Sequence, residues 1–220
     1  MTHITIGTHN AYRGRATFRP FADIIGWQEV KGQESAAKLR RQLPRYKHFV
    51  PAGQAVQVPV SYDPAKVELM NAWAVPTHES GRAMGMLGFT PRRYVVVAIF
   101  KVKGVDGRLA FVNTHMINAA WGRWRPTRAL RRRLWRKHQE VFADVARRLR
   151  ASDHLVIAAG DLNRQAWDVI PGLRDARYEP RPGLDHIMTA PSKRLRVRSV
   201  EKGTTDGSDH RRVVAGFEIR

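Results

Sequence analysis

Short segments with the composition of β-strands recur along almost the whole chain. Each is rich in Val, Ile or aromatic residues and is bounded by Gly, Pro, Asp or Asn, as strands usually are. The expected strands are 3–9, 54–62, 66–75, 94–102, 109–115, 154–160 and 211–219. The longest apolar runs, such as "VVVAIF" at 95–100, are far shorter than the roughly 20 residues that span a bilayer. We therefore expect no transmembrane helix.

Helical periodicity is found in two segments. Residues 33–43 have a modest helical pattern, and residues 126–150 have a strong one in which apolar residues such as Leu130, Leu134 and Phe142 return at helical spacing. Pro126 suits the first turn of this long amphipathic helix, whose outer face is basic. Many strands, few helices and no linker predict a single α/β or α+β domain over residues 1–220, with sheets covered by helices.

The chain is strongly basic. It has 39 Lys and Arg residues against 19 Asp and Glu residues, a net charge of +20, and most of the basic residues are Arg. Since Arg binds phosphate through a planar pair of donors, this charge indicates a polyanionic partner. The alternative is a solvated basic surface encoded by a GC-rich genome.

Cysteine is absent from the sequence, which excludes disulfides and thiolate metal sites. The first residues do not have the pattern of a secretory signal. We therefore expect a cytoplasmic (intracellular) location. Separately, we expect a monomer.

Polar residues with catalytic chemistry follow several of the expected strands. Taken singly, each is a common turn former or a structural histidine, but together they can converge on one edge of a sheet, where active sites usually lie. These residues are His9, Asn10, Glu29, His115, Asp161, Asn163, Asp185, His186, Asp209 and His210.

This ordered set resembles the endonuclease/exonuclease/phosphatase superfamily, which has the deoxyribonuclease I-like fold. The resemblance rests on Asn10, "DIIGWQE", "VNTH", "GDLN", "LDHI" and "SDHR", and it extends from about residue 4 to residue 218. The stretch "VSYDPAKVEL" at 60–69 is similar to a strand-turn-strand of the family. The resemblance implies a four-layer α/β sandwich with two mixed sheets face to face and helices outside. It also implies hydrolysis of phosphate esters with a divalent cation.

The resemblance assigns a role to most of these polar residues. Glu29 is the expected principal ligand of Mg²⁺ or Mn²⁺, and Asn10 and Asp209 lie beside the same metal. Hard cations of this kind prefer such oxygen ligands.

Five further residues of the set are expected to act on the scissile phosphate. Asp185 orients His210, Asp161 positions or deprotonates the attacking water, Asn163 donates to a phosphate oxygen and His115 serves the leaving group. Either His210 or Asp161 is the base.

The segment "HMINAAWGRWRP" after His115 departs from the common family continuation. It places Trp121, Trp124, Arg123 and Arg125 near the expected site. Interleaved aromatic and Arg residues can bind nucleic acid, so Arg123, Trp124 and Arg164 are predicted to bind substrate. Alternatively, the tryptophans anchor the long helix.

These observations predict a metal-dependent nuclease, most simply an endonuclease that acts on DNA rather than RNA. One alternative is a phosphatase or phospholipid-type phosphodiesterase acting on a small or lipid phosphate ester. Another is a catalytically inactive nucleic-acid binder of the same fold, although none of Glu29, Asp161, Asp209 and His210 is missing.

Overall fold

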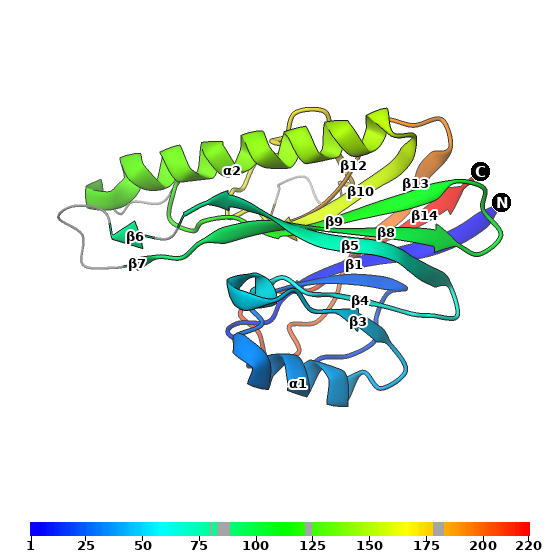
Figure 1. Ribbon diagram of the computed structural model, residues 1–220, viewed down its shortest axis with the longest axis horizontal. Coiled ribbons are helices and arrows are strands. Elements are labelled where there is room, and N and C mark those ends of the chain that lie inside the picture. Colours follow the sequence, from blue (N-terminus) through cyan, green and yellow to red (C-terminus); the bar gives the residue numbers. More distant parts are fainter. Residues whose placement is uncertain (80, 83–88, 122–124, 178–182) are drawn as a thin grey trace.

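The computed structural model describes residues 1–79, 81–82, 89–121, 125–177 and 183–220. Figure 1 shows the arrangement of its helices and strands. In chain order the elements are β1 (Thr2–Asn10), β2 (Ile24–Gln28), α1 (Gly32–Gln42), β3 (Lys47–Phe49), the 3₁₀ helix η1 (Gly53–Gln57), β4 (Val60–Tyr62), β5 (Val67–His78), β6 (Gly81–Arg82), β7 (Phe89–Thr90), β8 (Arg93–Val102), β9 (Arg108–His115), α2 (Arg125–Ala151), β10 (His154–Asp161), β11 (Arg174–Asp175), β12 (Asp185–Thr189), β13 (Leu195–Lys202) and β14 (Val213–Ile219).

Two sheets of six strands each form the middle of the molecule. The strand order is β13-β14-β1-β2-β4-β3 in one, here called the β1 sheet, and β11-β12-β10-β9-β8-β5 in the other, the β9 sheet. In the β1 sheet β1 and β2 are parallel, and in the β9 sheet β9 and β10 are parallel, whereas the other neighbours are antiparallel. Both sheets are therefore mixed.

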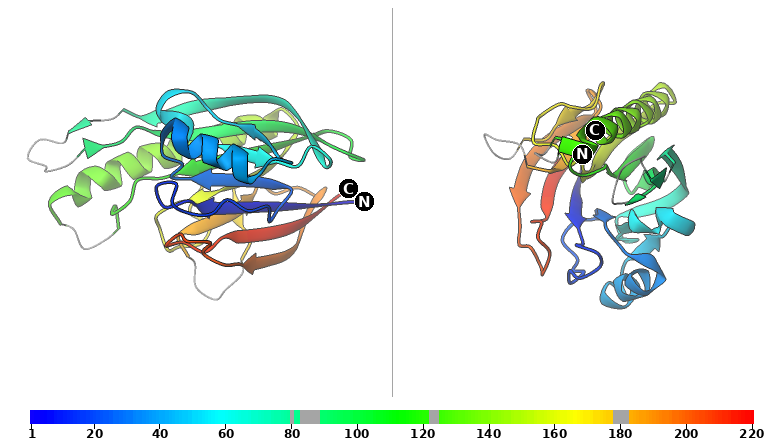
Figure 2. Two further views of the ribbon diagram at one scale, coloured as in Figure 1. Left: turned by 90° about the horizontal axis from the view of Figure 1, so that it is seen from below. Right: turned by 90° about the vertical axis from the view of Figure 1, so that its left-hand side faces the viewer.

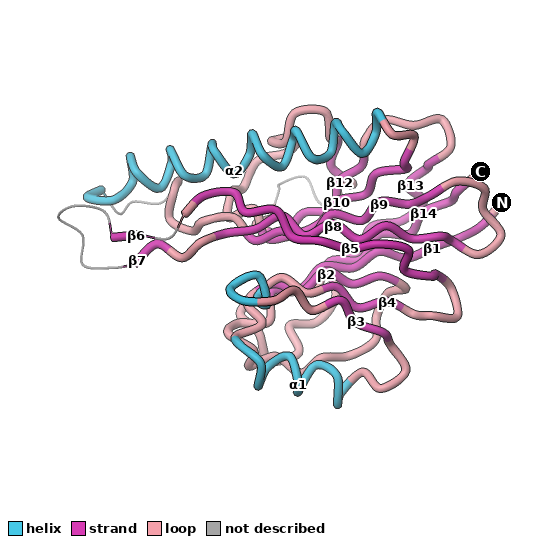
Figure 3. The backbone as a smooth tube through the Cα atoms, in the orientation of Figure 1, coloured by secondary structure: helices cyan, strands magenta, loops and turns pink. Residues whose placement is uncertain are grey.

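The two long helices cover the outer faces of the sheets. Figures 1 and 2 show α1 and α2 on opposite sides of the molecule, with the sheets between them. Figure 3 shows that strands dominate the described chain. The expected four-layer α/β sandwich, with mixed sheets inside and helices outside, is confirmed.

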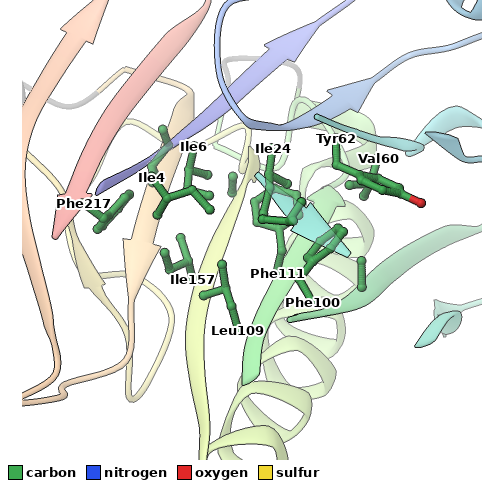
Figure 4. Close-up of a cluster of buried hydrophobic side chains, with 14 of the residues drawn as sticks. Ile4, Ile6, Ile24, Val60, Tyr62, Phe100, Leu109, Phe111, Ile157 and Phe217 are labelled. Atoms are coloured by element: carbon green, nitrogen blue, oxygen red, sulfur yellow. The ribbon is translucent and has the colours of Figure 1, made fainter. Parts of the chain in front are cut away.

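Side-chain alternation in the central strands explains the layering. In β8, Val96, Ala98 and Phe100 join the cluster between the sheets, whereas Val95, Val97 and Ile99 join the cluster under α2. Such a strand is apolar on both faces because both faces are buried. Figure 4 shows the cluster between the sheets, which includes Ile4, Ile6, Ile24, Phe111, Ile157 and Phe217.

Each helix buries one stripe of side chains. α1 packs Ala36 and Leu39 against the β1 sheet, and α2 packs Trp135, Phe142 and Ala146 against the β9 sheet. Most of the described Lys and Arg residues of α2 are exposed, on the face opposite this stripe. Among the described helices, none is both long enough and apolar enough to cross a membrane.

One expected strand is wrong. Residues 54–62 do not form a single strand: they form η1, which ends at Gln57, and the short strand β4, which begins at Val60. Pro59 between them has no N–H for a sheet hydrogen bond. The strand-turn-strand over 60–69 is confirmed as β4 and the start of β5.

Candidate active site

Strand ends from both sheets meet at one edge of the sandwich. Within the β9 sheet, Asp161 at the end of β10 is paired with His115 at the end of β9 and with Asp185 at the start of β12. Within the β1 sheet, Asn10 at the end of β1 is paired with Gln28 at the end of β2. This edge lies away from the paired chain termini (Figure 1). The convergence expected from the polar strand ends is thus present in the fold.

A buried amide pair joins the two sheets just behind this edge. The Gln28 side chain donates to Oδ1 of Asn113 at 2.8 Å, and the Asn113 amide donates to the carbonyl oxygens of Trp27, Val58 and Pro59 at 2.9–3.2 Å. A Cβ on Gly26 would lie 2.5 Å from Asn113 Oδ1, so only glycine allows this approach. Since Glu29 and His115 follow these amides closely in sequence, the pair holds β2 against β9 where the site begins.

Glu29 lies where β2 ends and keeps 29% of its side chain exposed. Its backbone is in the left-handed region, with φ of 56°, a conformation that costs a non-glycine residue energy and clusters at functional sites. The carboxylate accepts hydrogen bonds from the Arg13 backbone N–H at 3.0 Å and from the Asn10 side chain at 3.4 Å. One carboxylate oxygen is 3.9 Å from Nε2 of His115.

Asp161 is buried at the centre of the site. Asn10 and the backbone N–H of Asn163 donate to its carboxylate at 3.0 and 2.8 Å. Nε2 of His115 and Nε2 of His210 lie 3.5 and 3.9 Å from its Oδ2. Burial, and then the nearby carboxylate of Asp185, raise the pKa of Asp161 to about 7.

His210 forms a dyad with Asp185. Its Nδ1 lies 2.7 Å from Oδ2 of Asp185, and the Ser208 hydroxyl accepts from its backbone N–H at 3.0 Å. Burial would lower the pKa of His210, but the hydrogen bond and charge of Asp185 outweigh it and raise the pKa to about 9. The dyad therefore directs Nε2 toward Asp161.

His115 has a different partner. Arg93, buried at the start of β8, donates to Nδ1 of His115 at 2.7 Å and to Oε1 of Gln57 at 3.1 Å. A guanidinium has no acceptor, so Nδ1 must be unprotonated and the ring proton lies on Nε2. Burial, and then the charge of Arg93, hold the pKa of His115 well below its ordinary value. His115 thus presents a neutral N–H donor to the centre of the site.

The model of the Endonuclease/Exonuclease/phosphatase family matches residues 6–210. The chain belongs to this family. The match spans all the strand ends that form the site. A search of the curated proteins finds no match to this sequence.

Solved structures of the endonuclease/exonuclease/phosphatase fold are similar to this protein over nearly its whole length. A family member from Bacteroides vulgatus has a TM-score of 0.74 and 19% identity, with 100% of each chain covered. A mannosyl-6-phosphatase from Bacteroides thetaiotaomicron has a TM-score of 0.70 and 15% identity, covering 97% of this chain and 99% of the other. TDP2 from D. rerio, complexed with single strand DNA product, has a TM-score of 0.69 and 14% identity, covering 99% and 100%.

The site is suited to a divalent cation, as is typical of the endonuclease/exonuclease/phosphatase family. Asp161, Asp185 and His210 offer ligand atoms within 4.8 Å of one another, but Nδ1 of His210 is already bonded to Asp185. Glu29 is the more accessible carboxylate, and oxygen ligands suit Mg²⁺ or Mn²⁺. A cation held by Glu29 would lie close to Asp161, because the Asn10 amide bonds to both carboxylates.

The contacts of two predicted metal ligands, Asn10 and Asp209, give less support for metal binding than those of Glu29. The amide oxygen of Asn10 accepts from the Tyr12 N–H at 3.0 Å, so the amide nitrogen faces Glu29 and Asp161. Asp209 is exposed, and its carboxylate accepts a hydrogen bond from the Ser208 hydroxyl at 3.4 Å. Their ligation of a metal stays a prediction.

The predicted substrate-binding residues are only partly described. Arg123 and Trp124 lie outside the described residues. The Arg164 guanidinium lies over the Trp121 ring, 4.1 Å from its centre, and Arg132 lies over the same ring at 4.8 Å. Trp121 also packs against Trp135 of α2, which favours the anchoring alternative for this tryptophan.

Sequence reasoning missed Arg93, Gln57 and Asn113. Asn113 lies inside the quoted "VNTH" motif, and its amide between apolar residues was the available signal. Arg93 is one of many arginines, and nothing in the sequence sets it apart.

Proposed function

We propose that this protein is a divalent-metal-dependent nuclease that hydrolyses phosphodiester bonds and acts as an endonuclease on DNA. One observation carries the proposal: the His210–Asp185 dyad, Asp161 and Glu29 lie together at one edge of the sandwich, in a protein with a net charge of +20. Such a charge attracts the phosphate backbone of nucleic acid regardless of sequence. The DNA product described for the similar TDP2 structure supports this substrate class.

Asp161 and His210 would activate the attacking water. Their facing atoms are 3.9 Å apart, and interacting groups this close titrate as a pair. We assign the water proton to this pair rather than to either member. Asp185 holds the imidazole of His210 in position, as a buried acid does in other catalytic pairs.

The phosphate oxygens would be held by fixed donors. Asn163 is placed directly beyond Asp161, and its amide group is anchored on the Met116 carbonyl oxygen at 3.0 Å. His115 offers its Nε2 proton to the phosphate or the leaving oxygen. Because its pKa is low, His115 acts as a neutral hydrogen-bond donor that stabilises developing charge.

Glu29 would hold the metal, with Asn10 and Asp209 beside it. A bound divalent cation supplies charge neutralisation at the phosphate oxygens and lowers the barrier to attack. Asn10 links the two halves of the site because its amide reaches both Glu29 and Asp161.

The proposal is tested by nicking of supercoiled plasmid at low salt with Mg²⁺, Mn²⁺ or EDTA. Nicking that persists in the Glu29→Ala variant would reveal a contaminating nuclease. The matched control is Glu68→Ala, which changes an exposed glutamate of β5 on the far side of the fold. We expect metal-dependent nicking by the wild type and by Glu68→Ala, and none by Glu29→Ala.

Salt dependence provides a second readout. If about six to ten phosphates are contacted, affinity falls by roughly 10³ to 10⁵ between 50 and 200 mM salt. If the protein leaves abasic duplexes, plasmid and RNA intact while it hydrolyses p-nitrophenyl phosphate, the phosphatase alternative replaces the nuclease.

A further inference from the structure

A polar pocket of about 530 Å³ opens directly beside the candidate active site. Glu29 and His115 lie on the boundary between the two and line the pocket. Four basic residues complete its charged lining: Arg13, Lys31, Arg93 and Arg131. They come from the loop after β1, the start of α1, the start of β8 and the first turns of α2.

Positive charge exceeds negative charge in the described lining of this pocket. Glu29 is the one acidic residue in its described lining. Arg131 is held by neutral groups, the side chain and carbonyl oxygens of Asn118 at 2.8 and 3.2 Å. Within the described ranges, no ion pair joins a carboxylate to Arg13, Lys31, Arg93 or Arg131. Such a set of cations is suited to an anion that comes from outside.

Arg93 gives the pocket a fixed positive charge at its base. The residue is only 7% exposed, and its buried Nε has no hydrogen-bond partner among the described residues. Burial lowers the pKa of Arg93 to about 10, so the guanidinium stays charged at neutral pH. Because buried guanidinium donors are normally satisfied, the free Nε indicates a missing partner.

The amino end of α1 contributes to the same pocket. Lys31 and Gly32 line it, and Lys31, the cap residue of α1, forms no side-chain hydrogen bond with the first turn. The uncapped amino end of a helix attracts anions through its free N–H groups and its dipole.

We propose that this pocket binds a second phosphate of the substrate, adjacent to the phosphate that is cleaved. The proposal rests on the nuclease function proposed above and narrows it to substrates that carry at least two phosphates in sequence. Successive phosphates of a nucleic-acid strand are separated by one nucleotide, with a rise of about 3.4 Å along the helix axis. Because Glu29 and His115 belong to both the site and the pocket, the two phosphate positions would be neighbours. A sugar monophosphate or a lipid phosphodiester with one phosphate leaves the pocket unused.

The test compares three thymidine dinucleotides: TpT, which has one phosphate, and pTpT and TpTp, which have an additional phosphate on one or the other side. KM and kcat are measured for each with Mg²⁺. Charge-assisted hydrogen bonds contribute about 1.5–3 kcal/mol, so we expect one of the two-phosphate substrates to have a KM about 10- to 100-fold below that of TpT. Which of them gains identifies the side of the scissile phosphate on which the pocket lies.

Two variants connect this preference to the pocket. Arg13→Gln removes an exposed guanidinium but keeps the backbone N–H that binds Glu29. Arg131→Gln removes the charge contributed by α2. The matched control is Arg150→Gln, an exposed arginine at the opposite end of α2. The KM for TpT divided by the KM for the preferred substrate should fall toward one in Arg13→Gln and Arg131→Gln. The same ratio should stay unchanged in Arg150→Gln. Unfolding temperatures check that all variants are folded.

Equal KM values for the three dinucleotides, or a preference that survives in both pocket variants, would overturn the second-phosphate site while leaving the nuclease intact. Failure of the proposed function has a different signature. The wild type would then cleave neither the dinucleotides nor plasmid but would hydrolyse a small phosphomonoester, and both proposals would be rejected.

Discussion

Arg93 donates a hydrogen bond from its guanidinium to Nδ1 of His115, at 2.7 Å. The bond connects the start of β8 with the end of β9 and fixes which ring nitrogen of His115 carries the proton. His210 is paired instead with the Asp185 carboxylate, which can only accept, so Nδ1 of His210 carries a proton. The two imidazoles thus differ in which ring nitrogen carries the proton, and this difference matches the separate roles proposed above for His115 and His210.

Nitrogen-15 NMR of the metal-free protein should show His115 protonated at Nε2 and unprotonated at Nδ1 from pH 5 to pH 9. In Arg93→Gln, whose amide can both donate and accept, we expect the second tautomer to appear. A wild-type His115 that carries its proton on Nδ1 would show that the Arg93 bond is absent in solution.

Substitution of Asp185 by Asn should lower the pKa of His210 from about 9 by about 1–2 units, because a neutral partner stabilises the imidazolium less. An NMR titration of the His210 ring in EDTA measures this shift. The same variant should lose about 10²- to 10⁴-fold in kcat. An unchanged His210 titration would mean that the dyad does not exist in solution.

Asp161→Asn should change how stability depends on pH. The pKa of Asp161 is about 7 in the folded protein and has an ordinary value of 3.8. Stability linked to its neutral form is therefore complete below pH 3.8 and is lost as the pH rises through 7. Asn does not ionise, so urea unfolding in EDTA should show the variant gaining about 2 kcal/mol relative to the wild type between pH 5 and pH 8. A difference that is the same at both pH values would contradict the raised pKa.

Asn113→Ala should destabilise the fold by about 3 kcal/mol or more, because Gln28 and several carbonyl oxygens would lose their buried partner. The control is Asn71→Ala at an exposed position of β5, for which we expect a change within about 0.5 kcal/mol. Equal unfolding free energies for the two variants would show that the amide pair does not join the sheets.

The parts of the fold that follow local rules could be predicted from sequence. Strands such as β8 and β9 are continuous apolar runs with polar boundaries, and α2 has a helical stripe over many turns. The prediction of one strand over 54–62 was wrong because a short apolar run with alternating residues is compatible with both a strand and a 3₁₀ turn. Pro59 was the residue that could have divided it.

The residues at the centre of the site could be predicted because their order along the chain resembles a family, and the fold brings Asn10, Glu29, Asp161 and His210 together. Their partners could not. Arg93 reaches His115 across neighbouring strands, and Asn113 reaches Gln28 across the two sheets. Such contacts depend on the register and packing of distant segments, which periodicity and composition do not encode.

The most direct test of the central claim is single-turnover cleavage of a labelled DNA duplex in Mg²⁺ by the wild type, by His210→Gln and by Arg211→Gln, an exposed neighbour that serves as control. We predict Mg²⁺-dependent cleavage by the wild type and by Arg211→Gln, and a rate lower by about 10³-fold or more in His210→Gln. Equal cleavage by His210→Gln and the wild type, or cleavage that persists in EDTA, would contradict the assignment of this strand edge as a metal-dependent nuclease site.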